Sequence, residues 1–217
     1  PEGSDPGSAS TVAEAVRRGA QVVVACPPRS LVGEHAVGRD TTLLPTVTGD
    51  LLATAVVVLD YLSHIDIGPL ADADLVAEAL DRVAGACSPH RDLSVNPAKM
   101  LAISLADTQP IVWGGSVLAA RAARRIAEAI RRASGHSAIA GDVEHLLPLI
   151  ESARQRDVFA DPFADEAAER RVLLLMLDDG TEAPVAREQA GRLRAAAVAR
   201  GVRVEVLDTD ANAEVAR

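Results

Sequence analysis

Three small residues, Gly114, Gly115 and Ser116, stand where a short apolar stretch gives way to a long helical pattern. In a parallel α/β fold, such a junction places backbone N–H groups and the positive end of a helix dipole at the carboxyl end of a strand. We therefore predict that these residues bind a phosphate or a sugar hydroxyl. The alternative is that they only permit a tight turn between strand and helix. Upstream, the segment 96–99 (Asn-Pro-Ala-Lys) predicts the start of another helix, because proline suits a first helical turn.

Two arginines are further candidates for ligand binding, whereas the histidines and cysteines do not predict a metal site. Arg131 and Arg132 lie late in the long helical pattern and could meet an anionic ligand, although a solvated helix face is the alternative. The histidines show no spacing typical of metal ligands, and the two cysteines form no Cys-x-x-Cys pair. We expect no metal and no cofactor.

Composition excludes several classes of function. The chain has 217 residues, 48% of them hydrophobic, and a net charge of −9, which argues against nucleic-acid binding through Lys and Arg. No apolar stretch is long enough to predict a membrane span, and no signal peptide is apparent. Cys26 and Cys87 lie in apolar or helical surroundings and are expected to be reduced thiols. These features predict a cytoplasmic protein with no membrane or nucleic-acid partner.

Helical and strand patterns alternate along the chain. The run 172–177 is continuously apolar, as is typical of a buried parallel strand, and 117–134 is an amphipathic helix. A helix over 184–200 and a strand over 202–207 complete a right-handed βαβ unit. The other predicted elements are strands over 21–25, 43–44, 110–113 and 137–140, helices over 11–18, 49–62 (capped by Thr48), 72–87, 97–105 and 142–149, and loops over 1–10 and 157–169.

This alternation predicts an α/β fold class with parallel sheets in three α/β/α layers. Residues 1–68 lack a strand before their first helix, so we predict that they form the rear half of a first domain that is incomplete in this chain. Residues 71–95 are predicted to be a linking helix and connection, and residues 96–217 a complete second domain.

A series of residues in the second half resembles a known family. The series comprises Asn96-Pro97-Ala98-Lys99, Leu101-Ala102, Leu105, Pro110-Ile111-Val112-Trp113-Gly114-Gly115, Ala119, Arg124, 174–178, Pro184, 197–202 and Val204. It resembles the C-terminal sugar isomerase (SIS) domain of bacterial and archaeal bifunctional phosphoglucose/phosphomannose isomerases. The resemblance implies flavodoxin-like SIS domains, a homodimer and a sugar phosphate ligand. It also implies that a proton moves between C1 and C2 of an open-chain hexose phosphate through an enediolate.

The segment in the place of the family's phosphate loop departs from the family pattern. The family has Ser-Gly-Asn-Thr followed by an acidic pair, whereas this chain has Gly-Ser-Asp-Pro-Gly-Ser-Ala-Ser-Thr over 3–11. Asp5 within this segment would repel a phosphate by like charge. Four residues of this segment still carry hydroxyl groups at a helix N-terminus, and the resemblance assigns them to substrate binding: Ser4, Ser8, Ser10 and Thr11. The alternative is that they cap the helix or belong to a linker.

The catalytic positions of the family also differ here. Arg131 occupies the place of the catalytic glutamate, and a guanidinium cannot act as the base. His145 is the nearest match to the catalytic histidine, displaced by a few residues. Gly114, Gly115, Ser116 and Arg131 complete the substrate-binding set. The sequence thus predicts a glycine-turn pocket that has lost its proton-abstracting carboxylate.

Three hypotheses follow from this prediction. The first is a phosphosugar isomerase acting on glucose or mannose 6-phosphate. The second is a regulatory SIS protein that binds a sugar phosphate without turnover, which the arginine at 131 favours. The third is a scaffold whose helices serve only dimerisation.

Overall fold

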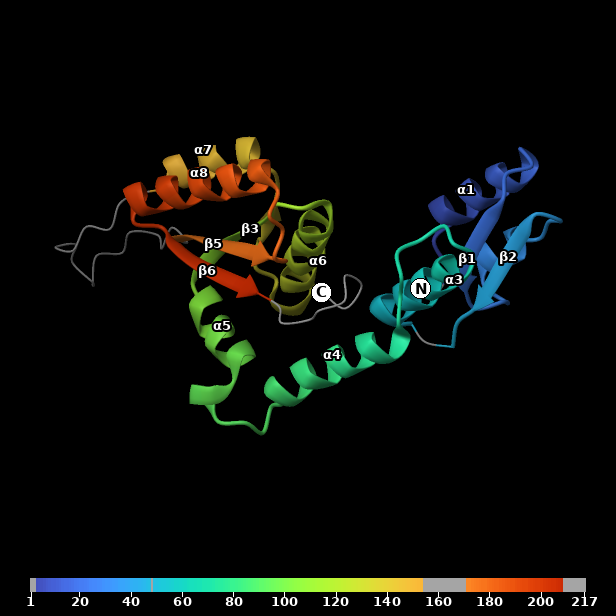
Figure 1. Ribbon diagram of the computed structural model, residues 1–217, viewed down its shortest axis with the longest axis horizontal. Coiled ribbons are helices and arrows are strands. Elements are labelled where there is room, and N and C mark those ends of the chain that lie inside the picture. The colour runs from blue at the N-terminus through green and yellow to red at the C-terminus, as the bar shows by residue number, and fades with distance from the viewer. Residues whose placement is uncertain (1–2, 48, 154–170, 209–217) are drawn as a thin grey trace. The chain divides into compact units, whose positions relative to one another are not determined.

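A computed structural model describes residues 3–47, 49–153 and 171–208. The chain divides into two compact units, the first ending at Ala84 and the second beginning at Gly85 (Figure 1). The boundary falls near the end of helix α4 (Ala73–Ala86). The predicted cap at Thr48 and the predicted loop over 157–169 lie outside the described residues. Within the described ranges, no helix is both long and apolar enough to cross a membrane.

The first unit contains a pair of parallel strands between helices. Its elements are α1 (Pro6–Arg17), β1 (Val22–Cys26), α2 (Leu31–His35), β2 (Thr41–Pro45) and α3 (Leu51–His64). Val22 lies opposite Thr41, so the apolar pair predicted over 43–44 does form a strand beside β1. Val24 and Cys26 pack with buried side chains of α1 and α2, and the Tyr61 hydroxyl of α3 donates to Thr42 Oγ1 at 3.4 Å.

Helix α1 begins earlier than the sequence pattern predicted. Thr11 and Glu14 have the spacing of a capping box, but the helix starts at Pro6 and Asp5 is its N-cap. The Asp5 carboxylate accepts the backbone N–H of Ser8 at 2.6 Å, and Pro6 suits the first turn. Thr11 lies inside the helix, where its hydroxyl donates to the Gly7 carbonyl at 2.9 Å. The predicted loop over residues 1–10 is therefore wrong from Pro6 onward.

The second unit is a four-stranded parallel sheet with the order β4-β3-β5-β6. Ile111 of β3 lies opposite Ile139 of β4 on one side and Leu174 of β5 on the other, and Leu174 also faces Val204 of β6. The elements in chain order are the 3-10 turn η1 (Leu93–Val95), α5 (Pro97–Leu105), β3 (Thr108–Gly114), α6 (Val117–Ser134), β4 (Ile139–Ala140), α7 (Val143–Glu151), β5 (Arg171–Asp178), α8 (Pro184–Arg200) and β6 (Arg203–Asp208).

Helices cover both faces of this sheet, which gives the predicted three layers. Ile111 and Leu174 point to the face where they pack with Leu146 of α7 and Leu193 of α8. The intervening residues of β3 and β5, such as Val112, point to the other face and pack against α6 and α5. Alternation of side chains along a strand therefore divides one apolar run between two cores. Figure 1 shows α7 and α8 together on one side of the sheet.

Candidate functional site

The order of the strands creates a crevice between β3 and β5. From β3 the chain passes through α6 to β4 on one side, and then through α7 to β5 on the other side of β3. Helices leaving neighbouring strands in opposite directions separate at the carboxyl edge of the sheet, which is where ligands bind in open α/β folds. The carboxyl ends of β3 and β5 carry Gly114 and Asp178.

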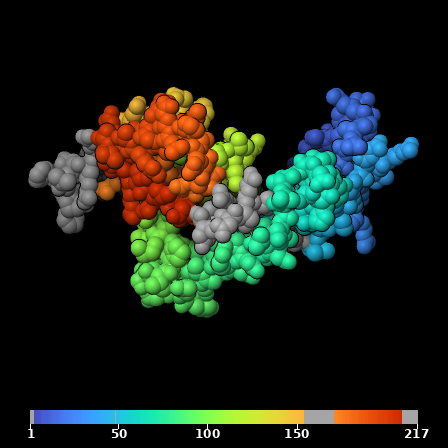
Figure 2. Space-filling model, in the orientation of Figure 1, coloured from blue at the N-terminus to red at the C-terminus, as the bar shows by residue number. Residues whose placement is uncertain are grey.

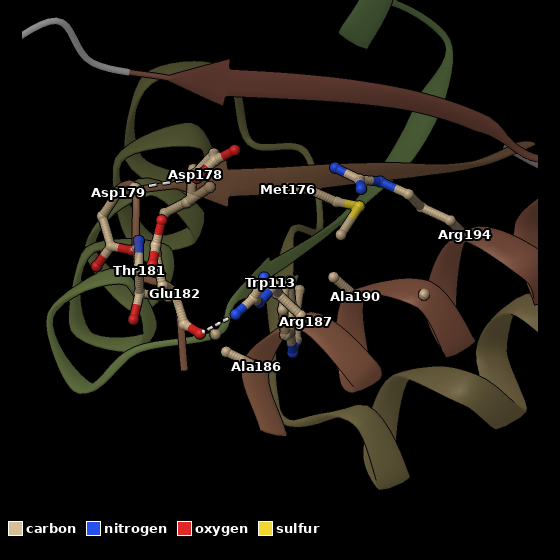
Figure 3. Close-up of a pocket in the computed structure, with 14 residues that line it drawn as sticks. Trp113, Met176, Asp178, Asp179, Thr181, Glu182, Ala186, Arg187, Ala190 and Arg194 are labelled. Atoms are coloured by element: carbon tan, nitrogen blue, oxygen red, sulfur yellow. Dashed lines mark hydrogen bonds between the residues drawn. The ribbon is translucent and has the colours of Figure 1, made fainter. Parts of the chain in front are cut away.

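A cavity of about 540 Å³ lies at this edge, on the α8 side of the sheet (Figure 3). Its apolar wall is formed by Trp113, Met176 and Ala186. Its polar wall comes from the β5–α8 loop and from one face of α8. The residues lining the cavity are Trp113, Gly115, 176–182, Ala186, Arg187, Ala190, Gly191 and Arg194. All of them belong to the second unit.

The β5–α8 loop is held by its own carboxylates. Asp178 Oδ1 accepts the Gly180 N–H at 3.0 Å, and Asp179 Oδ1 accepts the Thr181 N–H at 3.2 Å. Gly180 has φ +72°, the left-handed region that glycine adopts without strain. Arg187 Nη2 donates to the Glu182 carbonyl at 2.7 Å and ties the end of the loop to α8. Hydrogen bonds between residues close in sequence thus fix the loop, and the carboxylates of Asp178 and Glu182 remain at the cavity.

Ser116 connects the two sides of the crevice. As N-cap of α6, its hydroxyl oxygen accepts the Ala119 N–H at 3.0 Å. The same hydroxyl donates to Asp179 Oδ2. Because its one proton is already donated, Ser116 could donate to a ligand only by releasing Asp179. Its predicted role in substrate binding therefore requires rearrangement of this bond.

Gly114 and Gly115 have different reasons to be glycine. A Cβ on Gly115 would lie 2.8 Å from Trp113 Cη2 and 2.9 Å from Ala186 Cβ, at the cavity wall. A Cβ on Gly114 would lie 2.3 Å from the carbonyl carbon of Ala119, in the first turn of α6. Gly115 lines the cavity, whereas Gly114 allows β3 and α6 to approach closely. The tight-turn alternative thus describes Gly114 better than ligand binding does.

Gly114→Ala should destabilise the second unit by about 1–3 kcal/mol, because relief of the clash requires α6 backbone to move. Urea unfolding followed by the fluorescence of Trp113, the only tryptophan in the chain, measures this change. Gly191→Ala is the matched control: its Cβ would meet nothing within 4 Å in the middle of α8, so this variant should be as stable as the parent or more so. Equal stability of Gly114→Ala and the parent would contradict the packing argument.

The structure does not bring Arg131 to the cavity. Helix α6 begins at the carboxyl edge, and Arg131 lies 14 residues beyond its first residue, about 21 Å along the axis. There its Nη1 donates to the Ala138 carbonyl at 2.5 Å, just before β4. Arg131 therefore holds the turn into β4 at the amino edge of the sheet.

His145 does not line the cavity either. It lies in the first turn of α7, its side chain is 79% exposed, and its Nδ1 is 2.6 Å from Asp142 Oδ1. Asp142 is the N-cap of α7. Bonding to the His145 side chain and backbone N–H lowers the pKa of Asp142 below its usual value. In this conformation the ring is engaged in capping.

The hydroxyls predicted to form a phosphate loop belong to the first unit. Ser4, Ser8, Ser10 and Thr11 are all exposed. Bonds from Ser8 lower the pKa of Asp5, which occupies the N-terminus of α1 as a carboxylate. The Asp5 carboxylate, which the sequence predicted would repel a phosphate, therefore occupies the position at which an anion would have to bind.

The acidic groups of the cavity were not predicted from the sequence. The sequence predicted a glycine-turn pocket that had lost its proton-abstracting carboxylate, but Asp178, Asp179 and Glu182 line the cavity beside Gly115. That prediction is wrong because the register of β5 brings this loop alongside the glycine turn, with Leu177 opposite Gly114. The acidic pair at the end of the most apolar strand was the available signal. Among the described residues, no group of acidic, histidine or cysteine side chains is arranged to hold a metal ion.

The second unit is an α/β domain with a cavity at the carboxyl edge of its sheet. Residues 94–217 match the family described as the bacterial phospho-glucose isomerase C-terminal SIS domain. The chain belongs to this family, as the sequence analysis predicted. No curated protein matches the chain.

Proposed function

We propose that the chain binds a hexose 6-phosphate in the cavity of its second unit and interconverts the aldose and ketose forms. The observation that carries the proposal is a cavity at the β3–β5 crevice that places carboxylates and guanidinium groups around an apolar wall. Family membership supports a phosphosugar as the ligand.

Each wall of the cavity suits one part of such a ligand. Carboxylates of Asp178 and Glu182 can accept hydrogen bonds from sugar hydroxyls, and guanidinium groups pair with phosphate. The apolar wall formed by Trp113 and Met176 suits the C–H faces of a sugar. A neutral apolar ligand would leave these charged groups unpaired on binding.

Isomerisation requires a base that moves one proton between C1 and C2 while a second proton passes between O1 and O2, with no change in the overall oxidation state. Asp178 and Glu182 are the candidates within the cavity. Both carboxylate oxygens of Asp179 already accept hydrogen bonds, from Ser116 and from the Thr181 N–H, whereas Asp178 accepts the Gly180 N–H through Oδ1 alone. We expect Asp178→Asn to lower kcat for conversion of glucose 6-phosphate to fructose 6-phosphate by at least about 100-fold. The amide can still accept the Gly180 N–H, so the loop should be retained.

The second candidate function is binding without turnover. It is favoured by the placement of Arg131 and His145, the positions matched to the family's catalytic pair, outside the cavity. A chain that is stabilised by hexose 6-phosphates but forms no fructose 6-phosphate would be a sensor. Turnover that His145→Ala abolishes and Asp178→Asn leaves intact would instead restore the histidine as the acid–base residue.

We further propose that the chain works as a homodimer in the cytoplasm, as the family resemblance implies. Light scattering on the purified chain measures the mass. A monomer at working concentration would contradict the dimer, while leaving the ligand proposal in place.

A further inference from the structure

One face of α8 carries two arginines toward the cavity. Arg187 and Arg194 are seven residues apart, so they share a face of the helix and lie about 10.5 Å apart along its axis. Between them the cavity is lined by Ala190, with only a methyl side chain, and by Gly191, where an added Cβ would meet nothing within 4 Å. Figure 3 shows Arg194 beside Met176 and Arg187 at the loop.

The guanidinium groups of α8 differ in what they already bind. Arg187 donates to the Glu182 carbonyl at 2.7 Å and shapes the loop. Arg192 does not line the cavity, and its Nη1 pairs with Glu144 Oε1 of α7 at 2.9 Å. Arg194 has no hydrogen-bond or ion-pair partner among the described residues. Arg187 commits one of its N–H donors to the loop, whereas all five N–H donors of Arg194 are available to an anion in the cavity.

Charge is therefore unevenly distributed along the cavity. Asp178, Asp179 and Glu182 lie at the loop end, beside the carboxyl ends of the strands, whereas Arg194 lies two helical turns into α8. An anionic group at the loop end would meet three carboxylates and only the one guanidinium of Arg187, whereas Arg194 is paired with no carboxylate among the described residues. A ligand with a phosphate at one end and hydroxyls at the other can therefore bind in one orientation, with its phosphate at Arg194 and its hydroxyls at the carboxylates of the loop. The surface formed by α8 and β6 appears in orange to red in Figure 2.

We propose that Arg194 binds the phosphate of the ligand and thereby directs its hydroxyl-bearing end toward Asp178. This inference rests on the proposed function and adds the orientation of the ligand. Arg187 keeps its loop bond and acts as a positioning residue. Charge-assisted bonds to a phosphate are among the stronger polar contacts, so Arg194 determines preference for phosphorylated over free sugars.

The test compares Arg194→Gln with Arg192→Gln by calorimetric titration of glucose 6-phosphate into the full chain. Both variants remove one positive charge from α8, but only Arg194 lines the cavity. We expect Arg194→Gln to weaken binding about 10- to 100-fold and Arg192→Gln to change it less than about threefold. Arg194→Lys, which keeps the charge, should recover part of the loss.

Two results would overturn the inference, and they differ in what else they overturn. If the unmodified chain binds glucose 6-phosphate and Arg194→Gln binds it as tightly as Arg192→Gln does, Arg194 is not the anchor but the proposed function stands. If the unmodified chain does not bind glucose 6-phosphate at millimolar concentration, the proposed function and the inference both fail.

Discussion

Leu174→Ala should destabilise the second unit by about 2–5 kcal/mol, the cost of a cavity at a fully buried leucine. Leu174 is 0% exposed and lies in the central region of β5, between Ile111 of β3 and Val204 of β6. It packs in the core shared with α7 and α8, in the same cluster as Trp113 and Met176 of the cavity wall. Chemical unfolding followed by Trp113 fluorescence reports on this core, because Trp113 is a member of it.

Two variants control for the type of substitution. Leu118→Ala removes the same atoms from a side chain that is 43% exposed on α6, and it should cost much less. Leu174→Met keeps the volume and should cost less than about 1.5 kcal/mol. Similar losses for Leu174→Ala and Leu118→Ala would contradict the placement of β5 at the centre of the sheet.

Asn96→Ala should cost about 2–4 kcal/mol, because it removes two hydrogen bonds at a site with no access to water. Asn96 is 0% exposed. Its Nδ2 donates to the Ser88 carbonyl at 2.8 Å, and its Oδ1 accepts the Lys99 N–H at 3.1 Å as the N-cap of α5. The side chain thus fixes the connection after α4 to the start of α5.

Asn96→Ser separates the two contributions. Serine is a good N-cap and can still accept the Lys99 N–H, but it is too short to replace the bond to Ser88. We expect an intermediate loss in thermal or urea unfolding. If Asn96→Ala were no less stable than Asn96→Ser, the buried bonds would not be what holds α5.

The fold was predictable where local signals and packing agree. The apolar run of β5, the long amphipathic α6 with left-handed Gly135 after its last residue, and the Pro184-to-Arg200 helix were all predicted within two residues of their bounds. Helix α1 was placed wrongly because two plausible caps compete, and Asp5 with Pro6 takes precedence over Thr11. Helix α2, five residues long, was missed because so short a segment has no periodicity.

The candidate site was predictable only in part. The sequence identified the glycine turn, because a strand, two glycines and a helix cap are contiguous there. It could not place Asp178 or Arg194 in the same cavity, because this depends on which strand pairs with β3 and on how α8 lies across β5. Arg131 was assigned to substrate binding by its place in the family pattern, but it lies near the end of α6, at the opposite edge of the sheet from the cavity.

The chain belongs to the phosphoglucose isomerase C-terminal SIS family. The family match covers the unit that holds the cavity, and the carboxylates at the β5–α8 loop supply groups that can accept a proton. We propose that this cavity receives a hexose phosphate, whether or not the chain then turns it over.

The melting temperature of the chain with and without glucose 6-phosphate, read from Trp113 fluorescence, tests that claim most directly. Binding to the folded state alone adds about 2.7 kcal/mol of stability when the ligand is at 100 times its dissociation constant. We predict a rise of several degrees that saturates with concentration, and a smaller rise with glucose at the same concentration. An unchanged melting temperature at saturating glucose 6-phosphate, mannose 6-phosphate and fructose 6-phosphate would contradict it.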